Sequence, residues 1–163
     1  IAPYFKFPDW VISKNNLKKK LPNPNKIKLT TKKDLNKADK EELKKVRGIG
    51  EKLSNRIINY RKKLQGFSYN SQLLEVWGLE KNIMKNLLLN FEVKSKPQIK
   101  KVNVNEASFK ELLAIVYIDY DLTKKIILYK NEVAEIQSID ELKKIDGFPL
   151  EKFNRIALYL CAK

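Results

Sequence analysis

Two glycines stand around an isoleucine in the stretch KKVRGIGEKL, residues 44–53, between a basic run and the start of an amphipathic segment. Glycine adopts a positive φ readily and lets the backbone approach a ligand closely. A helix that begins at Gly50 or Glu51 would point its unpaired N–H groups and the positive end of its dipole at an anion. Gly48-Ile49-Gly50 is therefore a turn and, in addition, a candidate cradle for a phosphate.

Basic side chains surround this turn. Arg47 comes directly before it. In the helix expected to follow, four polar side chains lie within about 60° of one another at roughly 3.6 residues per turn: Lys52, Arg56, Asn59 and Lys63. A charged stripe usually faces solvent, but beside two glycines we favour a surface that contacts phosphates.

The composition argues against catalysis. The chain has no histidine and one cysteine, Cys161, which excludes Ser-His and Cys-His pairs, the usual zinc ligand sets and an internal disulfide. The carboxylates stand mostly at helix starts and beside lysines, where capping and solubility explain them. We therefore expect no enzyme, no catalytic residue and no metal site.

The net charge points to a polyanionic partner. The chain has 163 residues, 43% of them hydrophobic, and a net charge of +15. Nucleic acid is the first expectation and an anionic membrane surface the second. Only four of the 34 basic residues are arginine, and a lysine-, asparagine- and isoleucine-rich chain can arise from genome composition alone, so the distribution of the charge matters more than its total. This stretch has no run of eighteen apolar residues and no signal-peptide pattern, so we expect neither a membrane span nor a signal peptide in it, and we rank a membrane surface below nucleic acid as its partner.

The elements that must position these residues come from an internal repeat. Residues 34–93 (repeat 1) and 102–163 (repeat 2) align without a gap. The matches are Asn36-Lys-Ala38 with Asn105-Glu-Ala107, the stripe Leu53, Ile57, Tyr60 and Leu64 with Leu122, Ile126, Tyr129 and Val133, and Gly78 with Gly147. Residues 94–101 are a basic linker between the two copies.

Each repeat is predicted to be helix, tight turn, helix, twice over. Capping boxes at Asp39 and Ser108 begin a short helix, and the apolar stripe predicts a longer helix that ends in repeat 1 at Gly66. Ser138 and the glutamate three residues later begin a third helix in repeat 2. A fourth helix is expected over about 81–91 and over 150–160. The fold class is therefore all-α, with two tandem units of short helices.

The first 33 residues are predicted to hold the tail of a truncated preceding repeat and a basic linker. IAPYF at 1–5 is similar to LLLNF at 87–91 and IALYL at 156–160, the segments that close the two repeats. We therefore expect an earlier copy before residue 1. Aromatic residues of this region are interpreted as remnants of packing in preference to a membrane anchor: Phe5, Phe7 and Trp10.

The ordered elements N-x-A, capping box, G-I-G and I-I-x-Y-R resemble the helix-hairpin-helix family, most closely the double-hairpin domain of the bacterial competence DNA receptors. The resemblance is strong over residues 34–93 and divergent over 102–163. It implies a bacterial protein, and leaves the location open between the cytoplasm and an envelope tether through a missing N-terminus.

The resemblance also implies binding of DNA without sequence preference, with double-stranded DNA favoured. In that family, hairpin N–H groups meet phosphate oxygens across the minor groove, sometimes with a monovalent cation held by hairpin carbonyls, and no other cofactor is implied. Carried onto this sequence, the candidate DNA-binding residues are Arg47, Gly48, Ile49, Gly50, Lys52, Arg56, Lys63, Gly78 and Lys81.

The other three hairpins depart from the glycine pattern. The second keeps Gly78 but has Glu80 where the family has its other glycine. The third has Tyr117 and Asp119 at the positions of Gly48 and Gly50. The fourth, residues 146–149, ends in a proline and so loses an N–H group. Only the first hairpin keeps the full pattern.

The net charge is also lower in repeat 2, the repeat whose hairpins depart further from the glycine pattern. Residues 34–93 carry twelve basic and eight acidic side chains, whereas 102–163 carry nine and ten. The basic stripe of repeat 1 becomes Asp121, Lys125, Leu128 and Glu132 in repeat 2. We expect repeat 2 to be a structural or protein-contacting unit. The alternative for the whole chain is a protein-interaction or scaffold repeat that binds no nucleic acid.

Overall fold

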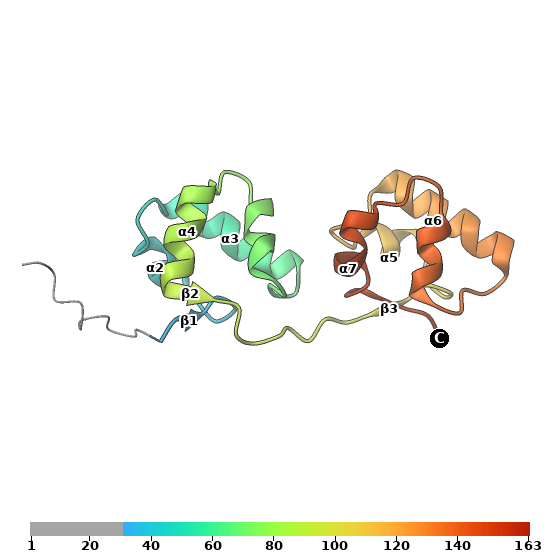
Figure 1. Cartoon of the computed structure of the whole chain (residues 1–163), viewed down its shortest axis with the longest axis horizontal. Helices are drawn as coiled ribbons and strands as arrows, with labels where there is room; N and C mark the ends of the chain where they lie inside the picture. The colour runs from blue at the N-terminus through green and yellow to red at the C-terminus, as the bar shows by residue number, and fades with distance from the viewer. Residues whose placement is uncertain (1–30) are drawn as a thin grey trace, which may run out of the picture. The chain divides into compact units, whose positions relative to one another are not determined.

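The computed structural model describes residues 31–163, which form short helices and two very short strand pairs (Figure 1). The elements of repeat 1 are β1 (Lys33–Asp34), α2 (Lys40–Lys44), α3 (Glu51–Lys63), the 3-10 helix η2 (Asn70–Glu75), α4 (Lys81–Asn90) and β2 (Phe91–Glu92). The elements of repeat 2 are β3 (Val102–Asn103), α5 (Phe109–Leu113), α6 (Tyr120–Val133), the 3-10 helices η3 (Ile139–Lys144) and η4 (Leu150–Lys152), α7 (Phe153–Ile156) and β4 (Leu160–Cys161). The all-α class with two tandem units is confirmed. The remnants expected at Phe5, Phe7 and Trp10 lie outside the described residues.

A parallel strand pair closes each repeat. Lys33 pairs with Phe91 in repeat 1, and Val102 pairs with Leu160 in repeat 2 (Figure 1). The sequence did not predict these strands, because two residues are too few to show an alternating pattern. Each pair brings the first and last residues of its repeat together.

The capping boxes that were predicted to begin the first helix of each repeat are confirmed. Asp39 accepts a hydrogen bond from the Glu42 N–H over 2.7 Å, and Ser108 accepts one from the Glu111 N–H over 3.3 Å. Both glutamates in turn accept from the N–H of their cap residue. Local hydrogen bonds therefore fix where α2 and α5 begin.

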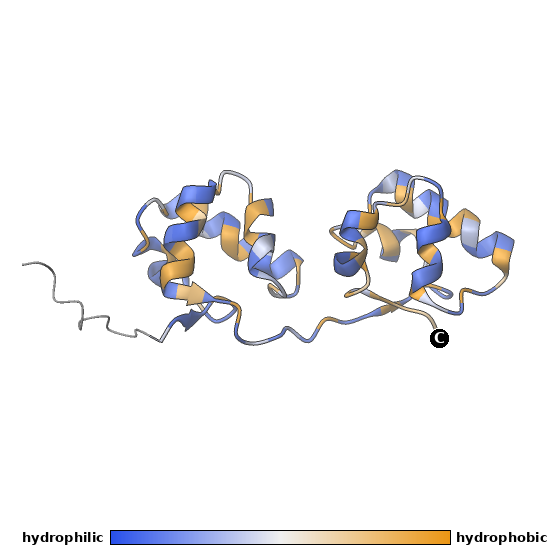
Figure 2. Ribbon diagram, viewed as in Figure 1, coloured by the Kyte–Doolittle hydropathy of each residue, from blue (hydrophilic) through white to orange (hydrophobic). Residues whose placement is uncertain are grey.

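The long helices bury the predicted apolar stripe. Leu53 and Ile57 of α3 are buried, as are Leu122 and Ile126 of α6. In Figure 2, hydrophobic and hydrophilic residues alternate along both helices, as expected for helices with one face in a core. This packing fixes which face of α3 remains exposed.

Two of the predicted helices differ from expectation. The helix expected after Ser138 is the 3-10 helix η3, and its capping box is present. The helix expected over 150–160 is wrong, because it is reduced to η4 and α7 and is followed by a turn at 157–159. In that turn, Tyr159 bonds to the carbonyl of Ile156, three residues earlier, so the α-helical pattern ends.

Side-chain bonds to the backbone hold each repeat together at equivalent positions. The Asn36 side chain donates to and accepts from the backbone of Phe67, over 2.9 and 2.8 Å. Asn105 does the same with Ile136, over 3.0 and 2.9 Å. Arg61 donates to the Ala38 carbonyl, as its counterpart in repeat 2 donates to the matching alanine. The recurring N-x-A sequence is therefore structural.

Glu75 of repeat 1 accepts hydrogen bonds from both repeats. Its Oε2 accepts from the hydroxyl of Tyr60 and, over 2.9 Å, from that of Tyr117. Arg155 forms an ion pair with Oε1. The buried Gln72 donates to the Tyr117 hydroxyl over 2.8 Å. Burial raises the pKa of Tyr117 to about 12, so this hydroxyl stays protonated at neutral pH.

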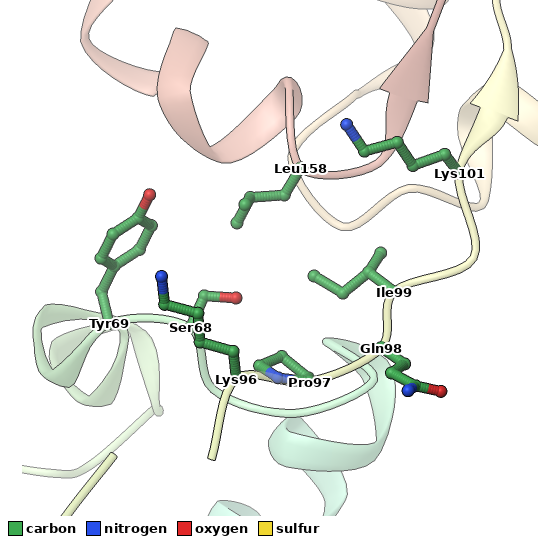
Figure 3. A pocket seen from close by; sticks show the side chains of 8 residues that line it. All are labelled: Ser68, Tyr69, Lys96, Pro97, Gln98, Ile99, Lys101 and Leu158. Atoms are coloured by element: carbon green, nitrogen blue, oxygen red, sulfur yellow. The ribbon is translucent and has the colours of Figure 1, made fainter. Parts of the chain in front are cut away.

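The linker also packs against its neighbours. Pro97 lies so close to Gly66 that a Cβ on this glycine would be 2.6 Å from the proline Cβ. Figure 3 shows Tyr69 of repeat 1, Ile99 of the linker and Leu158 of repeat 2 around one hollow of about 500 Å³. Apolar side chains thus accompany the basic ones in the linker.

Candidate nucleic-acid interface

All four hairpins share one hydrogen bond, and three of them have a glycine with positive φ within the turn, at Gly48, Gly78 and Gly147. In each, a buried apolar residue donates its N–H over 3.0 Å to the carbonyl of the buried apolar residue three positions earlier. The pairs are Ile49 with Val46, Leu79 with Val76, Ile118 with Ile115, and Phe148 with Ile145. The turn therefore belongs to the fold, and the hairpins differ in the residues at its exposed positions.

The two glycines of the first hairpin have different roles. Gly48 has a φ of 97°, and a Cβ on it would lie 3.0 Å from Cγ1 of Ile83. Gly50 has an extended backbone, with φ −99° and ψ −170°, and no other part of the described chain comes within 4 Å of the place its Cβ would take. Gly48 serves the turn and its packing, whereas Gly50 leaves open space at the start of α3.

The helix α3 begins without a side-chain cap. Its N-cap is Gly50, so the N–H groups of its first turn have neither an intrahelical partner nor a capping side chain. In repeat 2 the N-cap of α6 is Asp119, and its Oδ1 accepts from the Leu122 N–H over 2.9 Å. Free donors, open space and the positive end of the helix dipole thus coincide at the start of α3.

Two cations, Arg47 and Lys52, flank this helix start in the sequence. They are exposed and form no ion pair within residues 31–163, and the same holds for Lys63 at the other end of α3 and Lys81 at the start of α4. The nearby acid, Glu51, is paired with Lys40 and Lys44, the latter over 3.3 Å. Hydrogen bonds from these two lysines hold the pKa of Glu51 below its usual value. The carboxylate beside the candidate site is therefore compensated.

Arg56 contacts the second hairpin. Its Nη1 donates to the Trp77 carbonyl over 3.3 Å, and a Cβ on Gly78 would lie only 2.7 Å from that nitrogen. The counterpart in repeat 2, Lys125, donates to the Asp146 carbonyl over 2.7 Å. A basic residue of the long helix therefore holds the second hairpin in both repeats, and Gly78 makes room for it.

Ile49 has a structural position. Its side chain is only 4% exposed, and its N–H is already bonded to Val46 within the turn. Its N–H is therefore not free to bind a phosphate. Gly48 and Gly50, the candidate residues on either side of it, are exposed.

One exposed aromatic residue was not predicted. A hollow of about 250 Å³ lies between α3 and the second hairpin, and its lining includes Arg56, Asn59, Lys63 and Trp77. Trp77 is 76% exposed. The structure thus brings together three polar residues of the predicted stripe and an aromatic ring. The signal for Trp77 was its place in the turn, which matches that of Arg47 in the first hairpin.

A comparison with protein families identifies this architecture. The family model of the helix-hairpin-helix motif matches residues 30–90 and again residues 97–161. The chain belongs to the helix-hairpin-helix family. Helix-hairpin-helix motifs typically bind nucleic acid and are generally non-catalytic. Searches of the curated proteins and of the solved structures found no match.

The second helix-hairpin-helix repeat keeps the fold but changes the candidate interface. Asp121 and Glu132 stand where the first repeat has Lys52 and Lys63. Tyr117 occupies the position of Gly48, and its hydroxyl is bonded to repeat 1. The first helix-hairpin-helix repeat therefore has an open helix start that could receive a phosphate. In the second repeat, the side chain of Asp119 caps the corresponding helix start.

Residues 31–163 lack two other kinds of feature. No helix there is both long and apolar enough to cross a membrane. Nor does that part of the chain hold a group of three or more cysteine, aspartate or glutamate side chains placed to ligate a metal ion.

Proposed function

We propose that this chain is a non-catalytic, sequence-non-specific DNA-binding module that contacts the phosphate backbone through the Gly48-Ile49-Gly50 hairpin. The main support is the start of α3, where N–H groups lack acceptors and the space in front of Gly50 is open. A phosphate oxygen at this place would supply the cap that Asp119 supplies in repeat 2. Membership of a family that typically binds nucleic acid supports the choice of ligand.

Exposed cations would add to this contact. Arg47 and Lys52 flank the hairpin, and Lys63 and Lys81 are exposed on α3 and α4. The linker at 94–101 adds four lysines and no acidic residue. With roughly two to five phosphates engaged, the affinity should be modest and should fall steeply with salt concentration.

The resemblance to competence DNA receptors refines this proposal. It supports double-stranded DNA as the preferred form and DNA uptake in a bacterium as the setting. A monovalent cation bound by carbonyls of the first hairpin belongs to the same proposal. Arg56 and Gly78 then act indirectly, by holding the second hairpin and its neighbour Lys81 beside α3.

The test is a titration of a fluorescent random-sequence 20-base-pair duplex, followed by anisotropy at low and moderate salt. Arg47→Glu/Lys52→Glu should weaken binding at low salt by well over tenfold, because two phosphate contacts become repulsive. The matched control is Lys110→Glu/Lys124→Glu, which makes the same change in net charge on exposed residues of repeat 2. It should weaken binding only slightly. Equal losses in the two variants would contradict a site at the first hairpin.

A protein-contacting role is a second candidate, specific to repeat 2. Its five exposed large hydrophobic residues all stand at positions that are polar in repeat 1. They are Leu113, Val116, Tyr120, Leu128 and Leu150, in place of Lys44, Arg47, Glu51, Asn59 and Lys81. The Phe109 ring packs on that of Tyr120 with centroids 5.2 Å apart. With Asp119 and Asp121 beside Tyr120, this surface fits a partner that presents apolar side chains next to basic ones.

Selection of random peptides on the whole chain tests this second candidate. The enriched peptides should combine apolar and basic residues, and should lose binding when the residues of repeat 1 are restored by Leu113→Lys/Val116→Arg. Enrichment that is the same on this variant would eliminate the surface as a protein-contacting site.

A further inference from the structure

Trp77 stands at the second hairpin with one face of its ring covered and the rest accessible. The residue is 76% exposed. Cζ of Arg56 lies 3.9 Å from the ring centroid, and the bond from Nη1 to the Trp77 carbonyl holds the guanidinium there. Within residues 31–163 no other aromatic ring pairs with this indole. One face of the ring is therefore available to a flat ligand.

The fold alone does not require an indole at this position. In repeat 2 the same turn forms with Asp146 there, and Lys125 makes the bond to its carbonyl over 2.7 Å. The contact between long helix and hairpin thus accounts for the basic residue in both repeats. It does not account for the large exposed ring, which occurs in the repeat that also has the open helix start.

The surroundings of the ring suit part of a nucleotide. The hollow that Trp77 borders has a volume of about 250 Å³. This is below the roughly 300 Å³ at which pockets for whole small molecules begin. Asn59 offers an amide with donors and an acceptor, and Lys63 an ammonium group. The one acid in the lining, Glu75, is already bonded to Arg155 and Tyr117 of repeat 2.

We infer that Trp77 stacks on an unpaired nucleobase, while Lys63 contacts a phosphate beside that base. This inference rests on the proposed function, because it places the base beside α3, the helix whose start would bind the backbone. Stacking on an aromatic ring tolerates every base, so it preserves the lack of sequence preference. The guanidinium held on the other face adds a cation where the strand is negative. A single strand, or a single strand that adjoins a duplex, then has one contact that a blunt duplex lacks.

The test uses the whole chain with Trp10→Phe, which leaves Trp77 as its one tryptophan. Three ligands of equal length are compared: a thymine 20-mer, a 20-mer of abasic sites, and a blunt duplex. The thymine strand should quench the fluorescence of Trp77, and the abasic strand, which has the phosphates without bases, should not. Trp77→Ala should weaken binding of the thymine strand roughly tenfold and leave the other two affinities unchanged.

Two further variants serve as controls for the loss of the ring. Trp77→Phe keeps a smaller ring and should retain most of the affinity for the thymine strand. Leu89→Ala removes another exposed apolar side chain, 69% exposed, and should change nothing. Equal weakening of all three ligands by Trp77→Ala would overturn the inference, because the ring would then act only by positioning Arg56. So would binding of the thymine strand that is unaffected by Trp77→Ala. Failure of the proposed function is a separate result, namely duplex binding that survives Arg47→Glu/Lys52→Glu.

Discussion

Repeat 1 leaves the start of α3 open, whereas repeat 2 closes the start of α6 with its own carboxylate, from Asp119. Both hairpins keep the 3.0 Å hydrogen bond between buried apolar residues, although Gly48 has a positive φ and Tyr117, at the matching position, does not. This hydrogen bond therefore forms with a positive-φ glycine, as at Gly48, and without one, as at Tyr117. The fold can thus be kept while the residues at the exposed positions of the hairpin change.

The third hairpin has gained a contact where it lost a glycine. Tyr117, at the position of Gly48, bonds to Glu75 and Gln72 of repeat 1. Arg155 reaches the same carboxylate. The departure of repeat 2 from the family pattern thus includes a polar contact with its neighbour. The difference teaches that two copies of one fold can differ at equivalent positions, one with an open helix start and the other with a contact to its partner repeat.

The largest effect should come from breaking this polar contact. Glu75→Ala removes the acceptor for Tyr60, Tyr117 and Arg155, all partly buried, and should lower the free energy of unfolding by about 2–3 kcal/mol. Urea denaturation measures this change. Lys144→Ala, at the matching position in repeat 2, alters a side chain that is 69% exposed and should change stability by less than about 0.5 kcal/mol. Similar losses would show that Glu75 has no special role.

A smaller effect should come from giving repeat 1 the cap of repeat 2. Gly50→Asp fits the extended backbone and the open space, so stability should stay the same or rise by a few tenths of a kcal/mol. The new carboxylate would occupy the proposed phosphate position, and duplex affinity should fall roughly tenfold. The reciprocal change, Asp119→Gly, should not create DNA binding, because Tyr117 and Asp121 remain. Duplex affinity that is unchanged by Gly50→Asp would place the DNA contact elsewhere.

The smallest effect concerns the end of the long helices. Ala134 has a φ of 63° at the centre of a γ-turn, in which the Glu135 N–H bonds to the Val133 carbonyl over 2.7 Å. Glycine relieves the strain of this conformation, so Ala134→Gly should stabilise the fold by about 0.5–1 kcal/mol. Gln65→Gly, the matching change in repeat 1, removes the acceptor for the Lys100 N–H and should gain less. Thermal denaturation of the two variants measures both gains in stability. A larger gain for Gln65→Gly than for Ala134→Gly would contradict the prediction.

The sequence predicted those parts of the fold that depend on short-range signals. The capping boxes at Asp39 and Ser108 and the helix over 81–90 were found because their causes lie within a few residues. The strand pairs and the shortened α7 were missed. A two-residue strand such as β1 exists only because a partner about one repeat away in the chain lies beside it.

The site residues divide in the same way. Glycine turns and exposed cations could be read from local sequence, so Arg47 and Lys52 were expected to be accessible and are. The bond of Arg56 to the second hairpin and the exposure of Trp77 depend on tertiary packing. Glu75 is one acid among many in the sequence, and only the contact with repeat 2 distinguishes it. Its partners come from distant segments, so no local pattern reports them.

The parallel strand pairs bring the two ends of each repeat together. Chain entry and exit lie next to each other, since Lys33 pairs with Phe91 and Val102 with Leu160. A gene segment that encodes one such unit can be duplicated in tandem, because the ends of the added copy lie next to each other. Adding a further repeat to the chain then requires only a short linker. Each added copy is free to specialise at its exposed positions, as the two described copies have done.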